Sequence, residues 1–200
     1  MCSRYELRSN IESIIAGFAL RVAPGDERSR GATAFNLPEI RPTNLAPIIG
    51  HGRELSWRPW GLNVDWQNQP VINARGETLE QKPTFKPLLN RRILVPSSAY
   101  FEWRKAGRDK IKTRIHLAEQ DLMAFAGLVS DDAFTVVTCA PSNSIAHIHD
   151  RMPVVLDLAA QDAWLSPRPF AEVKHVLQSS VQPLAFEELS PPQRQGELFS

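Results

Sequence analysis

The sequence predicts an α+β protein: one domain built on antiparallel, barrel-like β-sheet with peripheral helices. Short runs rich in β-branched and aromatic residues recur along the chain between turn residues. Sixteen prolines interrupt any long helical periodicity. The 200 residues, 42% of them hydrophobic, suffice for one substantial core, and neither an internal linker nor a repeat of about 20–50 residues divides them. We therefore expect a single domain over residues 1–200, with residues 191–200 as a C-terminal tail.

The first elements follow from local signals. Residues 3–7 read as a strand, and Asn10 is suited to cap a helix over residues 10–19, because its side chain can accept from the first free N–H groups. Residues 21–36 are rich in Gly, Pro, Ser and charge, which predicts a surface loop. An extended segment is expected over residues 44–50, and a strand leading into an aromatic loop over residues 54–64.

The later elements continue the β pattern. Residues 70–78 are expected to form a loop, residues 84–90 a short helix, and residues 92–104 a strand pair or bent strand. Further strands are predicted over residues 114–117, 122–129, 134–138 and 152–156. Ser142 is expected to cap a short helix ending at His147, and two terminal helices are expected over residues 159–165 and 171–178.

The net charge of +1 hides an asymmetry along the chain. Residues 51–115 carry thirteen Lys/Arg and six Asp/Glu, a net charge of +7, whereas residues 116–200 carry four and eleven, a net charge of −7. Such a distribution can concentrate a positive field on a surface that binds polyanions, or it can belong to an ordinary solvated face. Charge alone does not decide between them.

Cysteine usage and hydropathy suggest the compartment. Cys2 and Cys139 make no disulfide framework, and there is no secretory signal. The most apolar early stretch, residues 11–20, is too short to cross a bilayer. We expect a cytoplasmic protein without a membrane span.

The residue around which a chemical function could be organised is Cys2. If Met1 is removed after synthesis, Cys2 carries an α-amine and a thiol on adjacent carbons, with pKa values of about 8 and about 8.5. Such a 1,2-aminothiol condenses with an aldehyde to an imine, and the thiol then closes a thiazolidine ring. A small residue at position 2 can also have no chemical role, and its position alone favours this simpler explanation.

Two later segments could supply helpers for this nucleophile. Asn73 could orient a hydroxyl or carbonyl and Arg75 could hold a phosphate, although a surface turn would contain the same residues. Glu102 lies between Phe101 and Trp103, and apolar surroundings raise the pKa of a carboxyl towards the range useful for acid–base catalysis. Strand alternation puts the two rings on the opposite face, so if they pack inward Glu102 faces outward, into a cleft or simply into solvent.

A third segment, residues 147–153, combines imidazole, carboxylate and guanidinium groups. His149 could move protons and Arg151 could bind a phosphate. A competing interpretation is a zinc site in which His147 and His149 join Cys139 or Glu102, but no second metal-like spacing supports it.

Three tryptophans, Trp57, Trp60 and Trp66, are interleaved with arginines. This pattern is typical of a surface that stacks on the bases of single-stranded nucleic acid and contacts its phosphates. Tryptophans this close together also serve cores, so we expect at least one to be buried and at least one to be exposed.

Four motifs follow one another over residues 1–156: Met1-Cys2, Asn73-Ala-Arg75-x-Glu77, Val95-Pro followed by Phe101-Glu102-Trp103, and His149-Asp-Arg-Met-Pro153. Together they resemble the SRAP family of abasic-site-processing proteins. The resemblance implies an SRAP-like fold and covalent linkage to abasic sites in single-stranded DNA during the DNA damage response. We expect no metal ion and no cofactor, and a DNA-associated monomer.

The resemblance also implies roles for individual residues. The Cys2 amine attacks the aldehyde of the ring-opened sugar, Asn73 positions the amine or a sugar oxygen, Glu102 is the acid–base residue, and His149 assists ring opening and reversal of the link. Exposure of Cys2 could be autoproteolytic, and the imine could instead proceed to β-elimination, an AP-lyase outcome. The implied DNA contacts are Arg4, Arg75, Arg151 and Trp66.

The sequence departs from the family pattern at three positions. Ser3 and Ala99 replace usual glycines, and Gly76 stands where Ala is common. The added Cβ at Ser3 restricts φ and could change how the Cys2 amine is presented.

The sequence leaves two other functions open. One is an N-terminal-nucleophile peptidase or amidase. The other is a DNA-binding module without chemistry, whose salt-sensitive binding would survive Cys2→Ala.

Overall fold

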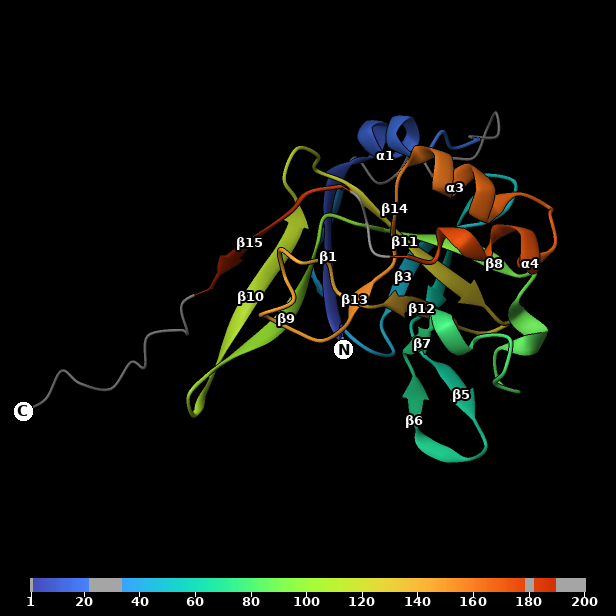
Figure 1. The fold of residues 1–200 in the computed structure, drawn as a ribbon. Coiled ribbons are helices and arrows are strands. Elements are labelled where there is room, and N and C mark those ends of the chain that lie inside the picture. Colours follow the sequence, from blue (N-terminus) through green and yellow to red (C-terminus); the bar gives the residue numbers. More distant parts are fainter. Residues whose placement is uncertain (1, 22–33, 179–181, 190–200) are drawn as a thin grey trace, which may run out of the picture.

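The computed structural model describes residues 2–21, 34–178 and 182–189, and two large sheets organise them (Figure 1). The first sheet is antiparallel. In spatial order it contains β15 (Leu184–Glu188), β10 (Asp109–Leu117), β9 (Ala99–Ala106), β1 (Arg4–Asn10) and β2 (Ala34–Ile40). The N-terminal strand β1 is therefore an interior strand, paired on both sides.

The second sheet has eight strands. Its main path runs through β13 (Met152–Pro153), β12 (Phe134–Cys139), β11 (Met123–Val129), β8 (Arg92–Ser97), β3 (Leu45–Ile49) and β4 (Leu55–Pro59). Off this path, β14 (Val155–Leu156) pairs with β11, and β7 (Asn73–Arg75) pairs in parallel with β12. The predicted α+β class and the dominance of antiparallel sheet are confirmed, and the two sheets are open rather than closed into a barrel.

The core lies between the two sheets, and aromatic rings from both meet there. Tyr5 of β1 packs edge-on against Trp60, with centroids 5.1 Å apart, and against Phe125 of β11 at 6.0 Å. Tyr100 of β9 contacts the same Phe125 ring at 6.0 Å. Because these edge-to-face contacts join β1 and β9 to the second sheet, they fix where the N-terminal segment sits.

Few helices accompany the sheets. α1 (Ile11–Gly17) begins at the predicted cap, where the Asn10 side chain accepts from the N–H of Ser13 at 2.7 Å. α3 (Leu158–Leu165) is capped in the same way by Asp157, and α4 (Phe170–Val173) follows it. No helix in the described part of the chain is long and apolar enough to cross a membrane.

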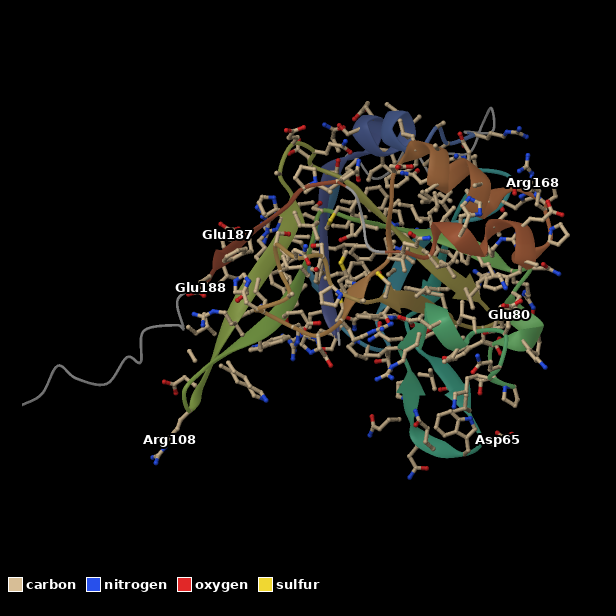
Figure 2. The ribbon with its side chains drawn as sticks, viewed as in Figure 1. Asp65, Glu80, Arg108, Arg168, Glu187 and Glu188 are labelled. Carbon is tan, nitrogen blue, oxygen red and sulfur yellow. The ribbon has the colours of Figure 1, made fainter. Side chains whose placement is uncertain are left out.

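Two hairpins extend from the end of the molecule at which β1 begins (Figure 1). One joins β9 to β10, and the other joins β5 (Leu62–Val64) to β6 (Gln67–Val71). Figure 2 shows Arg108 at the tip of the first hairpin and Asp65 at the tip of the second. Gly107 makes the first turn possible, because its φ of +62° lies in the left-handed region.

Several predicted elements differ from the structure. The predicted loop 21–36 already contains the first residues of β2, and residues 22–33 and the predicted tail lie outside the described residues. The predicted loop 70–78 includes the end of β6, strand β7 and a 3₁₀ turn. Both β2 and β7 form because a distant partner, β1 or β12, supplies hydrogen bonds that local composition cannot reveal.

The two short helices predicted in the middle of the chain are also reduced. Residues 143–148 form successive turns, held by hydrogen bonds such as the one from the Ile145 N–H to the Ser142 carbonyl at 3.1 Å. Residues 84–90 contain only the 3₁₀ turn Lys86–Leu88, in which Pro87 has no N–H to donate.

Candidate active site around Cys2

Cys2 lies immediately before β1 and is 1% exposed. Its Sγ donates a hydrogen bond to the Arg4 carbonyl oxygen at 3.5 Å. Burial, reinforced by the nearby charge of Glu102, raises the pKa of the thiol well above its ordinary value. The thiol is therefore protonated at neutral pH until a base removes its proton.

Asn73 ties this N-terminal residue to the second sheet. Its Nδ2 donates to the Cys2 carbonyl oxygen at 2.7 Å. Asn73 is the first residue of β7, and the parallel pairing of β7 with β12 sets it opposite Val136. Its Oδ1 is buried and has no hydrogen-bond partner among the described residues, so this oxygen can still accept from an amine.

Glu102 comes from β9 and is 3% exposed. Burial raises the pKa of its carboxyl to about 7, and the charge of Asp150 adds to this effect. At neutral pH both the acid and the carboxylate are populated. Tyr100, two residues earlier on the strand, belongs to the core and shares the face of Glu102.

The sequence left open which face of β9 is turned to the core. Phe101 lies under the ammonium group of Lys112, 4.2 Å from the ring centroid, and Trp103 lies under the guanidinium of Arg4 at 5.6 Å. These cation–π contacts from neighbouring strands cover both rings, and Phe101 is only 3% exposed. Glu102 consequently faces the interior side of the sheet.

His149 approaches Glu102 from the segment before β13. Its Nε2 lies 3.8 Å from the Glu102 Oε2, and its Nδ1 accepts from the Arg151 N–H at 3.0 Å. The same Nδ1 lies 2.9 Å from the Asp150 Oδ1, a contact that is a hydrogen bond only when Nδ1 carries a proton. Burial lowers the pKa of His149 and favours the neutral ring, which accepts from Arg151 and carries its proton on Nε2.

Arg151 is held at the margin of the site by an ion pair. Its Nη1 and Nη2 donate to the two carboxylate oxygens of Glu77 at 2.7 and 2.9 Å, and Nη2 also donates to the Thr138 carbonyl oxygen at 2.8 Å. The pair lowers the pKa of Glu77. The partner role of Glu77 could not be predicted, because 74 residues separate it from Arg151.

The other predicted DNA contacts do not join this cluster. Arg4 projects from the outer face of β1 and pairs with Glu39, which also binds Arg41 and Lys112. Although burial opposes the shift, hydrogen bonds from these three cations lower the pKa of Glu39 to about 2. Arg75 is exposed on β7, and Trp66 is 65% exposed on the β5–β6 hairpin.

The three tryptophans divide as expected. Trp60 is fully buried, and its Nε1 donates to the Ile72 carbonyl oxygen at 2.8 Å. Trp57 is 43% exposed and stacks on Phe35 at 5.9 Å, while Trp66 is the most exposed of the three. Only Trp66 therefore presents most of its ring to solvent.

The zinc interpretation gains no support from this arrangement. Among the residues that the structure describes, no group of three or more His, Cys, Asp or Glu side chains could hold a metal ion.

Two buried tyrosines on the core side of the first sheet, Tyr5 and Tyr100, were not singled out from the sequence. Both residues are fully buried, and burial together with the charge of Cys2 raises both pKa values. The signal was present, since strand alternation alone puts Tyr100 on the face of Glu102.

Comparison with solved structures first identifies the kind of fold to which this chain belongs. The fold matches a protein from Bacteroides thetaiotaomicron with a TM-score of 0.77 and 21% identity, covering 94% of this chain and 92% of that one. It also matches a phage-related protein from Bordetella bronchiseptica with a TM-score of 0.72 and 23% identity, covering 95% of each chain.

Residues 1–191 match the family described as SOS response associated peptidase (SRAP), and the chain belongs to this family. It is 33% identical over 187 residues to the abasic site processing protein YoqW of Bacillus subtilis (strain 168), covering 84% of this chain and 81% of that protein. It is 34% identical over 116 residues to the abasic site processing protein YedK of Escherichia coli (strain K12), covering 53% and 52%. The abasic site processing protein HMCES of Xenopus tropicalis is 29% identical over 142 residues, covering 52% and 42%.

Proposed function

We propose that this protein processes abasic sites in single-stranded DNA by forming a thiazolidine link through Cys2, once Met1 has been removed. The observation that supports this most directly is the convergence on Cys2 of three separate segments. Asn73 binds its carbonyl oxygen, and the Glu102–His149 pair provides ionisable groups beside it. Relatives named as abasic site processing proteins suggest the class of substrate, an abasic site whose open sugar carries an aldehyde.

The first step is imine formation. The lone pair of the free Cys2 amine attacks the C1′ aldehyde of the ring-opened sugar and gives a carbinolamine, which loses water. The departing hydroxyl takes a proton from Glu102 in its acid form and leaves as water, and the His149 Nε2 lies 3.8 Å from the carboxylate that results. A carboxyl whose pKa is about 7 suits this exchange, because both of its forms are present at neutral pH.

The second step is ring closure. The Cys2 thiol passes its proton to the Glu102 carboxylate, and the thiolate attacks the iminium carbon. A C–S bond forms while the π electron pair of the C=N bond returns to nitrogen, so that aldehyde and aminothiol give thiazolidine plus water. If closure is slow, the same imine can proceed to β-elimination, the AP-lyase outcome.

The DNA strand is proposed to meet exposed groups first. Arg75 and Trp66 are exposed, so they can contact a phosphate and stack on a base without rearrangement. Arg4 and Arg151 are each paired with a carboxylate, so a phosphate would have to share or replace that partner. We assign them as contacts beside the lesion.

A peptidase that attacks external amides with the Cys2 thiolate is less well supported. The thiol is buried and its pKa is raised, so little thiolate is available at neutral pH, whereas reactive cysteines have lowered pKa values. The proposal still includes removal of Met1 by the protein itself, because each protein molecule needs to make this cleavage only once.

A denaturing gel tests the proposal. Protein shown by mass spectrometry to lack Met1 is incubated with single-stranded DNA that bears one abasic site, and a heat-stable shifted band is expected. Cys2→Ser keeps the amine but should give a band only after borohydride reduction, and Cys139→Ser is the matched cysteine control that should react normally. No band with the wild-type protein would sink the proposal, and binding that survives Cys2→Ala without any link would favour a binding module.

A further inference from the structure

Three cations on the outer face of the first sheet gather around a single carboxylate, that of Glu39 near the end of β2. Arg41 Nε donates to Glu39 Oε1 at 2.7 Å, and Arg41 Nη2 lies 2.7 Å from the same oxygen. The Arg4 guanidinium and the Lys112 ammonium bind this carboxylate as well. Three positive charges and one negative charge give this group, the Glu39 cluster, a net charge of +2.

The neighbouring group of charges on the same face has no such excess. Two residues further along β1, Glu6 Oε1 lies 2.7 Å from Arg114 Nη2. The other Glu6 oxygen lies 3.5 Å from Arg8 Nε, and Arg114 Nη1 lies 3.1 Å from Glu187. That group pairs two cations with two carboxylates and is neutral. An anion that approaches this face is therefore attracted to the Glu39 cluster.

Most N–H groups of the three cations remain available. Guanidinium and ammonium groups carry several N–H donors each, and Glu39 takes only one or two from each cation. Aromatic rings of β9 hold Arg4 and Lys112 in place, at 5.6 and 4.2 Å from the ring centroids. The side chains of Arg4 and Lys112 are each 32% exposed, and that of Arg41 is 60% exposed. A second anion can therefore bind the cluster without displacing Glu39.

The Glu39 cluster is connected directly to the nucleophile. The Arg4 carbonyl oxygen accepts the hydrogen bond from Cys2 Sγ at 3.5 Å. From the second sheet, Asn73 donates to the Cys2 carbonyl oxygen at 2.7 Å, and Arg75 follows two residues later on β7. Cys2 is thus bound by one segment of each sheet, and each of these segments carries a cation.

We propose that Arg4, Arg41 and Lys112 form a further site for a backbone phosphate, on the first-sheet side of Cys2. The inference rests on the proposed function and adds Arg41 and Lys112 to its DNA contacts. The phosphate shares the three cations with Glu39, which holds them in place. A strand bound here and at the arginines of the second sheet passes from one sheet to the other with its abasic sugar at Cys2.

Binding without chemistry tests this site. Arg41→Gln, Lys112→Gln and the double variant are made in protein that carries Cys2→Ala, and fluorescence anisotropy measures their affinity for a single-stranded oligonucleotide without an abasic site. Each single variant should bind about threefold more weakly, and the double variant about tenfold or more. Because the double variant leaves Arg4 paired with Glu39 and no net charge, the salt dependence of its binding should be weaker, with a slope smaller by about 0.7.

Arg8→Gln is the matched control. It removes one positive charge from the same face, but from the neutral group, so the DNA affinity should stay within about twofold of the wild-type value and the salt slope should not change. Lys112→Arg keeps the charge and should bind DNA as the wild-type side chain does. Unfolding midpoints of all these variants should stay close to that of the wild type, because the cations lie at the surface.

A neutral linkage identifies the phosphate that the cluster binds. Methylphosphonate, in which a methyl group replaces one charged oxygen, is placed at one linkage at a time on either side of a tetrahydrofuran analogue that has no aldehyde. At one of these linkages the substitution should weaken binding by the wild-type cluster and leave binding by the double variant almost unchanged. Equal weakening of both proteins at every linkage would overturn the site.

The remaining outcomes separate this site from the proposed function. Wild-type affinity and salt slope in the double variant would overturn the site even if the wild-type protein forms a link with abasic DNA. If the wild-type protein forms no link, the proposed function fails, and the affinity series alone decides whether the cluster binds DNA. Inorganic phosphate is the last comparison. If it raises the unfolding midpoint of the wild type but not of the double variant, while both bind DNA equally, the cluster is a site for small anions and its assignment to DNA is overturned.

Discussion

Burial acts in opposite directions on the two titrating groups beside Cys2. It raises the pKa of Glu102 to about 7 and lowers that of His149 below its ordinary value. A low-dielectric environment disfavours the charged form of each group, so burial favours the protonated acid of Glu102 and the neutral ring of His149.

Replacing Glu102 by Gln should separate chemistry from binding. We expect Glu102→Gln to slow formation of the link by about a hundredfold or more, because the amide neither donates an acidic proton nor accepts one from the thiol. Affinity for abasic DNA, measured by fluorescence anisotropy, should change little. Glu80→Gln, an exposed change on the same molecule, should affect neither quantity. Equal losses of rate and affinity in Glu102→Gln would make Glu102 a structural residue.

Glu102 should also leave a signature in the pH dependence of stability. A carboxyl whose pKa is higher in the folded state holds its proton more tightly there, so the free energy of unfolding is highest below about pH 4.5 and falls as pH rises to about 7. The loss is up to about 3 kcal/mol. Chemical denaturation at pH 5 and pH 8 should show this decline, and Glu102→Gln should flatten it. An identical decline in the variant would contradict the shifted pKa.

At the scale of secondary-structure elements, the Glu77–Arg151 ion pair joins the turn after β7 to the segment before β13. Glu77→Gln should lower the free energy of unfolding by about 1 kcal/mol, a modest value because the Glu77 side chain is 52% exposed. Since the pair lowers the pKa of Glu77, this stabilisation should be present at neutral pH and lost as the solution is acidified below about pH 4. Denaturant titrations at pH 7 and pH 3 measure it.

Glu80→Gln is the comparison for that experiment. Glu80 pairs with Lys174 through two half-exposed side chains, so its loss should cost less than about 0.5 kcal/mol. If Glu77→Gln and Glu80→Gln lower the free energy of unfolding equally at pH 7, the bidentate pair between Glu77 and Arg151 stabilises the protein no more than an exposed ion pair does.

The β5–β6 hairpin offers a test of base stacking. Trp66→Ala should weaken binding of single-stranded DNA by roughly fivefold or more without changing the unfolding midpoint, because its ring is mostly in solvent and stacking contributes about 1–3 kcal/mol per base. Trp60→Ala, in contrast, should cost about 3–5 kcal/mol of stability, since Trp60 is fully buried. Unchanged DNA affinity in Trp66→Ala would remove this hairpin from the interface.

The elements also show where sequence-based prediction succeeds. The Asn10 cap could be predicted, because the capping side chain and the N–H that it binds are three residues apart. β2 and β7 could not, because their hydrogen bonds go to β1 and β12. The orientation of Glu102 could not be decided from the sequence for a related reason. Alternation gives two faces, but the cations that cover Phe101 and Trp103 come from other strands.

At the scale of the whole molecule, the candidate site draws on four segments that lie far apart in the sequence. The residue types that such chemistry needs could be predicted from motifs, and Cys2, Asn73, Glu102 and His149 do come together. The partners that hold them could not be predicted, because the pairing of Glu77 with Arg151 depends on β7 and β13 both pairing with β12.

The charge distribution predicts a salt dependence of DNA binding. If Arg4, Arg75 and Arg151 each neutralise one phosphate, the logarithm of the binding constant should fall with the logarithm of salt concentration with a slope of about −2. Arg75→Gln should reduce the slope by about 0.7, whereas Arg91→Gln, which removes a surface pair with Asp131, should leave it unchanged. Titrations between low and moderate salt measure both, and equal slopes would exclude Arg75 as a phosphate contact.

The interior position of β1 has a mechanical consequence. β1 is hydrogen-bonded to β2 on one side and to β9 on the other, so its first residues are anchored along their length. A DNA strand joined at Cys2 and drawn away by a translocating enzyme would load these two ladders along the strand axis. The ladders would then have to shear together and could not peel apart one bond at a time. A protein attached in this way would act as a firm obstacle on the strand.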